Sequence, residues 1–553
     1  MPHNSSQWIT HTIDGGWATD YGKTHYATPD NFSLSIPWCN TCENIKFYPD
    51  GSFGKYPGCF SLVTAPIIAP ATSGFITSSR VYTLFDYVRL GTSLAGTRKR
   101  MAVVGSHLYD FTSSLSIPPI RVGELDITVA SVPHLTTFND LLIIATGFAP
   151  KSWDQTTFQS LAGTPPQFKF SAHHAGRQWA AGIAATPSKL HYSAVGNPED
   201  WVGAGSGSID IDPGDGDSIV GILPWKNELW VFKGPYRLSI HRITGASPTD
   251  FARKPFVYGI SAAGIASIFP VGNDFAFWSP RGSCHSLTAT DTFGDYAQSY
   301  INYPILSWCR NPVNVTNGTL SDSWQTVMDV SQNTSYSILN NNVSDTLKSE
   351  VIVMDWKFRS DTNPYPRFIR LPLLDKCSSI GMIPSTFNDS QLLPTFGTKY
   401  GIIKQEFPPD NTSYTNESKA FPYRIETPSL TYGPTYYRKT LAGISADVIS
   451  NFNPLNGEVG TLDISFGGRD VPGQTVSFSN RGGVPLGTFV LGVDQLGSVG
   501  SIPHFYEEGM GESEAFTYTL VENSPINPTR GNDVRVKHFS VLGIPSGTSM
   551  EAS

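Results

Sequence analysis

One stretch of the sequence places residues suited to nucleophilic catalysis close together. Residues 176–201 read GRQWAAGIAATPSKLHYSAVGNPEDW, with His191 and Ser193 two positions apart. Because side chains alternate between the faces of a strand, these two would point the same way and could act as base and nucleophile. However, no strained turn presents Ser193, and the sequence offers no third group to orient the histidine. We therefore interpret both as polar strand residues and expect no catalytic residues here.

The same stretch has the apolar runs and turn residues that are typical of a pair of strands. The apolar runs WAAGIA and LHYSAVG are separated at Pro187-Ser188, and GNPEDW follows with the acids Glu199 and Asp200. Asn197 and Pro198 favour a bend in the chain. We expect two strands of one sheet, capped by this turn.

Four aspartates crowd the segment GSIDIDPGDGDSIVG, residues 207–221. Their oxygens could form a calcium cage, but an EF-hand loop needs ligands at positions 1, 3 and 5, Gly at 6 and Glu at 12. Pro213-Gly214 break that register, and nothing fills position 12. The pattern favours a tight Asp/Gly hairpin turn without a metal. The four residues are Asp210, Asp212, Asp215 and Asp217.

The cysteines offer half of a zinc site. Cys39 and Cys42 have the spacing of a zinc knuckle, and Cys59 could be a third ligand, but a closed site needs four. We expect buried thiols or a local redox pair. Motifs of the P-loop, G-x-S-x-G and H-E-x-x-H kinds do not occur, so we expect neither an enzyme nor a cofactor. The six cysteines are residues 39, 42, 59, 284, 309 and 377.

The composition indicates an all-β protein. The chain of 553 residues has 51 Gly and 41 Pro, with 12% aromatic and 15% charged residues, which suits strands with many turns. A net charge of -8 argues against a protein that grips phosphate. We interpret the one basic run, Arg98-Lys99-Arg100, as solvated charges leading into a strand. The start shows no secretory signal, and the apolar stretches are too short to span a bilayer, so we expect a soluble chain.

Units of strand, turn and strand recur along the chain. They start near residues 101, 141, 178, 222 and 268, a spacing of roughly 40 residues that is typical of β-propeller blades. We predict a β-propeller of about six to seven blades over residues 45–420, preceded by an N-terminal arm, 1–44. Dense short strands over residues 421–553 predict an additional antiparallel, sandwich-like β domain. Its final strand either belongs to that domain or closes the propeller ring.

Three segments in order resemble a known family. They are RQWAAGIAATPSKLHYSAVGNPEDW, IDPGDGDSIVGILPWKNELWVFKGPYRLSI and GIASIFPVGNDFAFWSPRGSCHSLTATDTFGD. Together they look like the tail nozzle, or packaged-DNA-stabilisation, proteins of short-tailed bacteriophages. CNTCENIKFYPDGSFGKYPG resembles the opening blade of that family, and PLGTFVLG and GMGESEAFTYTLVE its closing β domain. One departure is Tyr56, preceded by Lys55, where the family usually has a basic residue before Pro-Gly.

The resemblance implies a virion structural protein of the phage tail, made in the host bacterial cytoplasm. Such proteins form a ring, commonly a hexamer, below the portal and adaptor ring, and contact tail fibres or spikes. They retain packaged DNA and gate its ejection without sequence-specific contact, and an acidic channel surface would repel the passing phosphate. Two alternatives stay open. One is a receptor- or carbohydrate-binding tail protein, and the other is a β-propeller glycosidase with paired carboxylates in its central mouth.

Overall fold

A computed structural model gives the fold of the 553-residue chain. The described residues are 7–21, 24–27, 33–70, 78–91, 97–113, 117–127, 132–287, 300–311, 324–339, 349, 351–357, 365–374, 376–408, 415–416, 419–432, 437–450, 459–468, 471–481, 504–506, 512–513, 515–522 and 534–549. The segment PLGTFVLG, which carried an expectation above, lies outside them.

The chain divides into two compact units. The first, called here the ring unit, comprises Ser61–Ile352 and Leu374–Glu406. The second, the terminal unit, comprises Met1–Phe60, Val353–Leu373 and Phe407–Ser553. These bounds follow how the chain packs, and they differ from the predicted boundaries at 44/45 and 420/421.

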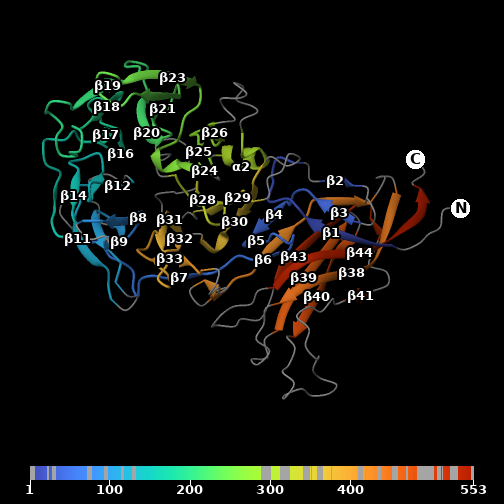
Figure 1. Ribbon diagram of the computed structural model, residues 1–553. Helices are drawn as coiled ribbons and strands as arrows, with labels where there is room; N and C mark the ends of the chain where they lie inside the picture. The colour runs from blue at the N-terminus through green and yellow to red at the C-terminus, as the bar shows by residue number, and fades with distance from the viewer. Residues whose placement is uncertain are drawn as a thin grey trace. The chain divides into compact units, whose positions relative to one another are not determined.

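The ring unit is a succession of antiparallel sheets, four of which have four strands (Figure 1). The all-β prediction is confirmed, because the described helical segments of this unit are single short turns. The strands, sheet by sheet, are β8 (Val81–Arg89), β9 (Thr97–Val104), β10 (His107–Asp110) and β11 (Ile120–Glu124); β12 (His134–Phe138), β13 (Leu141–Ala145), β14 (Lys151–Trp153) and β15 (Phe158–Ser160); β16 (Phe170–His174), β17 (Arg177–Ala181), β18 (Lys189–Tyr192) and β19 (Gly207–Asp210); β20 (Ser218–Trp225), β21 (Glu228–Gly234), β22 (Ser239–Thr244) and β23 (Ala252–Tyr258); β24 (Ile268–Val271), β25 (Asp274–Trp278) and β26 (Cys284–Ser286); β27 (Gln325–Asp329) and β28 (Thr334–Ile338); and β31 (Cys377–Pro384), β32 (Leu392–Thr398) and β33 (Ile403–Glu406). The helical turns are η1 (Ile265–Ser267), η3 (Tyr303–Ile305) and α2 (Leu306–Arg310).

The successive sheets of the ring unit form a closed circuit. The inner strands are β8, β12, β16, β20, β24, β27 and β31. β8 contacts β12, β12 contacts β16, and β16 contacts β20. η1 links β20 to β27, and β24 also contacts β27, which in turn contacts β31. Because β31 packs against β8, the circuit is complete, as is consistent with a β-propeller.

Burial on both faces explains why these strands are apolar runs. β13 reads LLIIA, and its last four residues are buried. One apolar cluster joins Trp179 and Leu190 of one sheet to Ile222 and Leu229 of the next. Since a sheet between two others has no solvated face, its strands lose the usual alternation of apolar and polar residues. Burying each such side chain contributes about 1.5–3 kcal/mol.

The strands of the terminal unit belong to three sheets, two of which combine segments near both ends of the chain. Its strands are β1 (Gln7–Ile13), β2 (Thr24–Ala27), β3 (Ser33–Ile36), β4 (Thr41–Glu43), β5 (Ile45–Phe47), β6 (Phe53–Lys55), β30 (Arg367–Arg370), β34 (Thr415–Asn416), β35 (Lys419–Ala420), β36 (Arg424–Glu426), β37 (Ser429–Tyr432), β38 (Tyr437–Ser450), β39 (Val459–Gly468), β40 (Val471–Arg481), β41 (His504–Tyr506), β42 (Glu512–Ser513), β43 (Phe516–Glu522) and β44 (Val534–Ser549). β7 (Cys59–Ser61) and β29 (Val351–Asp355) lie where the chain passes from one unit to the other.

Residues near the N-terminus, expected as an arm, are strands of these sheets. β1 pairs antiparallel with β44 and parallel with β3, so the unit is not purely antiparallel. The rings of His11 and Phe539 from this sheet meet Tyr518 of β43, which belongs to the other sheet. The final strand β44 therefore lies in the terminal unit, where it also pairs with β38.

Candidate functional site

The corner at residues 176–201 is built from the antiparallel pair β17 and β18, so the prediction of two strands of one sheet is confirmed. Ser193 is buried, and its hydroxyl accepts the backbone N–H of Gln178 at 3.1 Å and donates to the carbonyl of Ala194 at 3.0 Å. Within the described chain, no hydrogen bond joins Ser193 to His191, whose pKa is lowered by burial. The serine hydroxyl is committed to the backbone and has no base.

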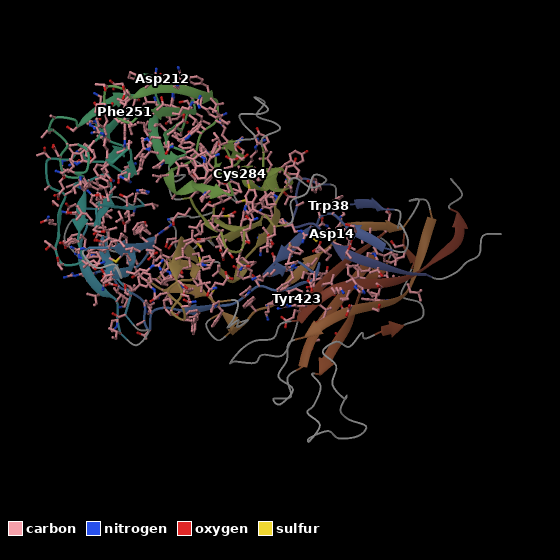
Figure 2. The ribbon with its side chains drawn as sticks, in the orientation of Figure 1. Asp14, Trp38, Asp212, Phe251, Cys284 and Tyr423 are labelled. Carbon is pink, nitrogen blue, oxygen red and sulfur yellow. The ribbon has the colours of Figure 1, made fainter. Side chains whose placement is uncertain are left out.

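The residue that holds this corner together is Arg177, which sequence reasoning did not single out. Its buried guanidinium donates from Nη1 to the carbonyls of Ser193, at 2.8 Å, and Gly205. The same group lies over the rings of Tyr192, at 5.5 Å, and Phe251, at 5.9 Å. Phe251 is labelled in Figure 2. A single arginine after a glycine turn looks like a solvated charge in the sequence, so no local signal marks this role.

An amide and a carboxylate side chain shape the turn of this corner. The side chain of Asn197 accepts the backbone N–H of Glu199 at 3.0 Å. The carboxylate of Asp200 accepts the backbone N–H of Gly203 at 2.7 Å. These are bonds of an Asx type that fix a bend, so the predicted turn is confirmed.

The aspartate-rich turn after β19 encloses a lysine. The side chain of Lys233 is 0% exposed and donates to the carbonyl oxygens of Ile211, at 2.7 Å, and Asp212, at 2.9 Å. It also donates to the carboxylate of Asp215, at 2.7 Å. Of the four carboxylates that the sequence offered to calcium, the ammonium of Lys233 thus binds that of Asp215.

Two further aspartates of this turn also bind groups of the chain. Asp217 accepts three consecutive backbone N–H groups of residues 236–238, each at 2.8 Å, between β21 and β22. Asp212, labelled in Figure 2, pairs with Arg253 and accepts the hydroxyl of Tyr258 at 3.2 Å. These carboxylates belong to a structural turn, but the predicted hairpin was wrong, because β19 and β20 lie in different sheets.

Ser239, His241 and Asp212 have the residue types of a catalytic triad but not its geometry. Nε2 of His241 lies 3.0 Å from Oγ of Ser239 and 3.6 Å from Oδ2 of Asp212. In a triad, the serine and the acid contact opposite ring nitrogens. Here both face Nε2, while Nδ1 is buried without a hydrogen-bond partner. The cluster therefore cannot pass a proton from the serine through the ring toward the acid.

The six cysteines are all buried, which confirms the interpretation as buried thiols. Burial raises the pKa of Cys39 to about 12 and that of Cys42 well above its ordinary value. Because the thiolate is the form that binds metals and attacks electrophiles, these thiols are held in the unreactive form. In the described part of the chain, no group of three His, Cys, Asp or Glu side chains could hold a metal ion.

The basic run at the start of β9 is ion-paired rather than solvated. Asp86 binds the guanidinium of Arg98 at 2.5 Å, and the side chain of Arg100 is only 9% exposed. The interpretation as solvated charges was wrong, because aspartates of the neighbouring strands β8 and β10, and one distant in sequence, come beside the strand. The partners of Arg98, Lys99 and Arg100 are, in order, Asp86, Asp110 and Asp389.

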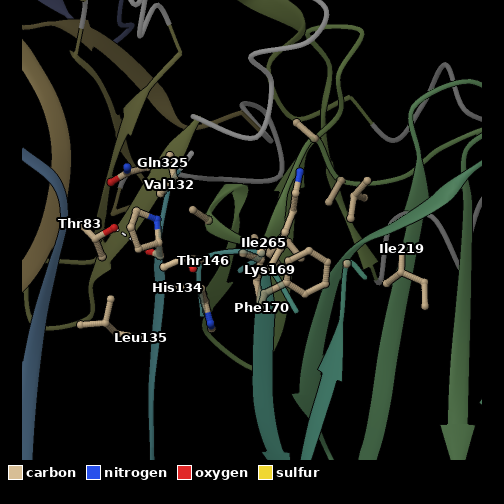
Figure 3. A pocket seen from close by; sticks show the side chains of 18 of the residues that line it. Thr83, Val132, His134, Leu135, Thr146, Lys169, Phe170, Ile219, Ile265 and Gln325 are labelled. Carbon is tan, nitrogen blue, oxygen red and sulfur yellow. Dashed lines mark hydrogen bonds between the residues drawn. The ribbon is translucent and has the colours of Figure 1, made fainter. Parts of the chain in front are cut away.

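A cavity of about 560 Å³ lies within the ring unit and is lined by all of its inner strands (Figure 3). The turns that follow β13, β17 and β21, each the second strand of its sheet, add four residues to the wall of the cavity. They are Gly147, Gly182, Pro187 and Pro235. Among the described residues that line it, Lys169 is the one charged side chain and none is a carboxylate.

The other polar groups around the cavity are largely engaged. The hydroxyl of Thr83 donates to the carbonyl of Pro133 at 2.7 Å. The amide of Gln325 bonds to two backbone groups, at 2.9 and 3.1 Å. Burial lowers the pKa of His134 to about 4, so this ring is neutral near pH 7. The cavity therefore presents one positive charge in mostly apolar surroundings.

No family model matches the chain, and no curated protein matches it by sequence. Several solved structures resemble it distantly. BBS1N in complex with ARL6DN has a TM-score of 0.37 at 10% identity, covering 64% of this chain and 98% of that one. The sialidase of Trypanosoma rangeli in complex with sialic acid has 0.27 at 9%, covering 84% and 98%. The β-fructofuranosidase of Schwanniomyces occidentalis has 0.22 at 9%, covering 86% and 97%.

These TM-scores are too low to carry an argument about function. Among the described helices, none is long and apolar enough to cross a membrane.

Proposed function

We propose that this chain is a structural protein of a phage tail. It forms a ring-shaped nozzle, commonly a hexamer in the family it resembles, below the portal and adaptor ring. There it retains packaged DNA and gates its ejection. In this proposal the ring unit is a seven-bladed β-propeller, with one blade for each inner strand, and the terminal unit is the additional sandwich-like β domain.

The observation that carries the proposal is the placement of the three segments that resemble nozzle proteins. The segment 177–201 supplies β17 and β18, 211–240 supplies β20 and β21, and 264–295 supplies η1 and β24 to β26. They fall on three consecutive sheets of the ring unit in the same order. A resemblance that follows the repeat of the fold is more specific than one confined to a single loop.

The charges of the chain fit the passage of DNA without tight binding. The net charge is -8, and the one run of three basic residues is neutralised by aspartates. Clustered unpaired Lys and Arg would instead release counterions from DNA and hold it. We propose that gating is steric and electrostatic, with the acidic balance of the ring keeping the genome free to move.

A receptor- or carbohydrate-binding role is the second candidate, and exposed aromatic side chains favour it. Tyr236 is 75% exposed and Tyr258 is 55% exposed, both in the ring unit. Such rings can stack on sugars. A glycan array without hits would remove this candidate. The glycosidase alternative needs two carboxylates in the central mouth, and the described cavity lining supplies none. Hydrolysis of any member of a broad glycoside panel would revive it.

The proposed function is tested in the virus that encodes the chain. Disrupting the coding sequence should give heads that package the genome and then lose it, measured as the fraction of DNA protected from nuclease. A receptor-binding protein would instead give full heads that fail to adsorb. Particles that keep their DNA and still adsorb would contradict both roles.

A further inference from the structure

The cavity of the ring unit has a character that the nozzle proposal does not use. Its volume of about 560 Å³ lies within the range of roughly 300–1,000 Å³ typical of small-molecule sites. The wall is mostly apolar, with Leu135, Phe170, Ile219 and Ile265 among its members (Figure 3). Such a wall suits a compact apolar body.

Lys169 is positioned in this wall by two glycines. A β-carbon added at Gly147 would lie 3.1 Å from Cγ of Lys169, and one added at Gly182 would lie 2.9 Å from its Cβ. Both glycines have positive φ, at +87° and +74°. The backbone N–H of Lys169 also donates to the carbonyl of Ala181 at 3.1 Å. The aliphatic stem thus lies against two backbone turns, which restricts where the ammonium can go.

The ammonium of Lys169 has no counter-charge of its own in the described structure. Within that part of the chain, no ion pair or hydrogen bond engages it, and the lining supplies no carboxylate. Lys169 is exposed at the cavity wall, whereas the buried lysines Lys233 and Lys55 are paired with Asp215 and Glu522. A cation beside an apolar wall gains most from an anion that brings its own apolar body.

We propose that this cavity binds a small organic anion, whose single carboxylate pairs with Lys169 and whose apolar or aromatic body packs against the inner strands. This site is independent of the nozzle role, since neither requires the other.

The test uses the full chain and three probes with one ring system. Isothermal titration calorimetry compares 2-naphthoate, its neutral analogue 2-naphthalenemethanol, and the cation 2-naphthylmethylammonium. We expect 2-naphthoate to bind at least about tenfold more tightly than the alcohol, and the cation to bind more weakly than either. Equal affinity of the carboxylate and the alcohol, or binding of none of the probes, would overturn the proposal.

Variants locate the binding. Lys169→Met should lower the affinity for 2-naphthoate to that of the alcohol and leave the alcohol unchanged, whereas Lys169→Arg should keep the preference. Lys254, exposed on β23 of the same unit, provides the matched control in Lys254→Met. Ala184→Trp, at an exposed lining position, should weaken both naphthyl ligands by filling the cavity. Unchanged binding in Lys169→Met or in Ala184→Trp would place the ligand elsewhere and overturn the proposal.

Discussion

Replacing Lys233 by methionine is expected to destabilise the ring unit strongly. Methionine keeps most of the aliphatic stem but removes the ammonium that binds Ile211, Asp212 and Asp215. The turn would then hold a carboxylate and two carbonyl oxygens without their donor. Removing one partner of a buried ion pair costs about 3–5 kcal/mol, because the other is left without compensation.

The exposure of the two partners sets the expected magnitude. The side chain of Lys233 is 0% exposed, but that of Asp215 is 18% exposed and can be partly hydrated. We therefore expect a loss near the lower end of the range, about 3 kcal/mol. Asp215→Asn keeps the lysine and an acceptor oxygen, so its cost should be smaller, about 1–2 kcal/mol. Lys254→Met, at an exposed position, should stay within about 0.5 kcal/mol of the natural chain.

Native-state hydrogen exchange measured by mass spectrometry suits this prediction, because a chain of two units need not unfold in one transition. Peptides that cover residues 207–244 report the free energy of opening of this turn and of β20 to β22. The order of loss should be Lys233→Met, then Asp215→Asn, then the control. A change below about 1 kcal/mol in Lys233→Met, or one equal to that of Lys254→Met, would refute the reasoning.

Three further predictions concern glycine, histidine and cysteine. Gly163→Ala should cost more than about 3 kcal/mol by urea unfolding, since φ is +76° and the new Cβ would meet the carbonyl oxygen of Glu199 at 1.5 Å. Gly196→Ala, with φ +72° and open space, should cost only about 1–2 kcal/mol, and equal costs would contradict the clash. Burial lowers the pKa of His11 from 6.5 to about 4, so the folded terminal unit favours the neutral ring, and the stability that this confers is complete above pH 6.5 and lost as the pH falls toward 4. The urea concentration at the unfolding midpoint of this unit should therefore decrease as the pH is lowered from 6.5 to 4, and this decrease should be smaller in His11→Gln. An equal decrease in the variant would assign the pH dependence to other groups. Cys39 should resist iodoacetamide at pH 8 in the native protein and react after denaturation, as read by intact mass, and prompt native modification would reveal an accessible thiolate.

The repeated sheets could be predicted because their signal is local. The runs that begin near residues 101, 141 and 178 fall on the second strands β9, β13 and β17. Those near 222 and 268 fall instead on the first strands β20 and β24. Both strands of a buried hairpin are apolar, so the pattern predicts the spacing of the sheets but not which strand of a sheet it marks.

Contacts between distant segments could not be predicted. Lys55 and Glu522 form a buried ion pair at 2.9 Å although 467 positions separate them. Strand β1 likewise pairs with the distant strand β44, so segments near the two ends of the chain meet in one sheet. Arg177 and Lys233 look like surface charges in the sequence, because their acceptors come from other turns. A single sequence shows the composition and the spacing of the apolar strands, but it does not show which residues pair with the buried charges.

The central claim is that the chain assembles as a ring with the adaptor of its virus. Electron microscopy of the full chain at high concentration, mixed with that adaptor ring, tests it most directly. We predict closed rings with a central opening, stacked on the adaptor. Isolated monomers alone, in the presence of an intact adaptor ring, would contradict the account.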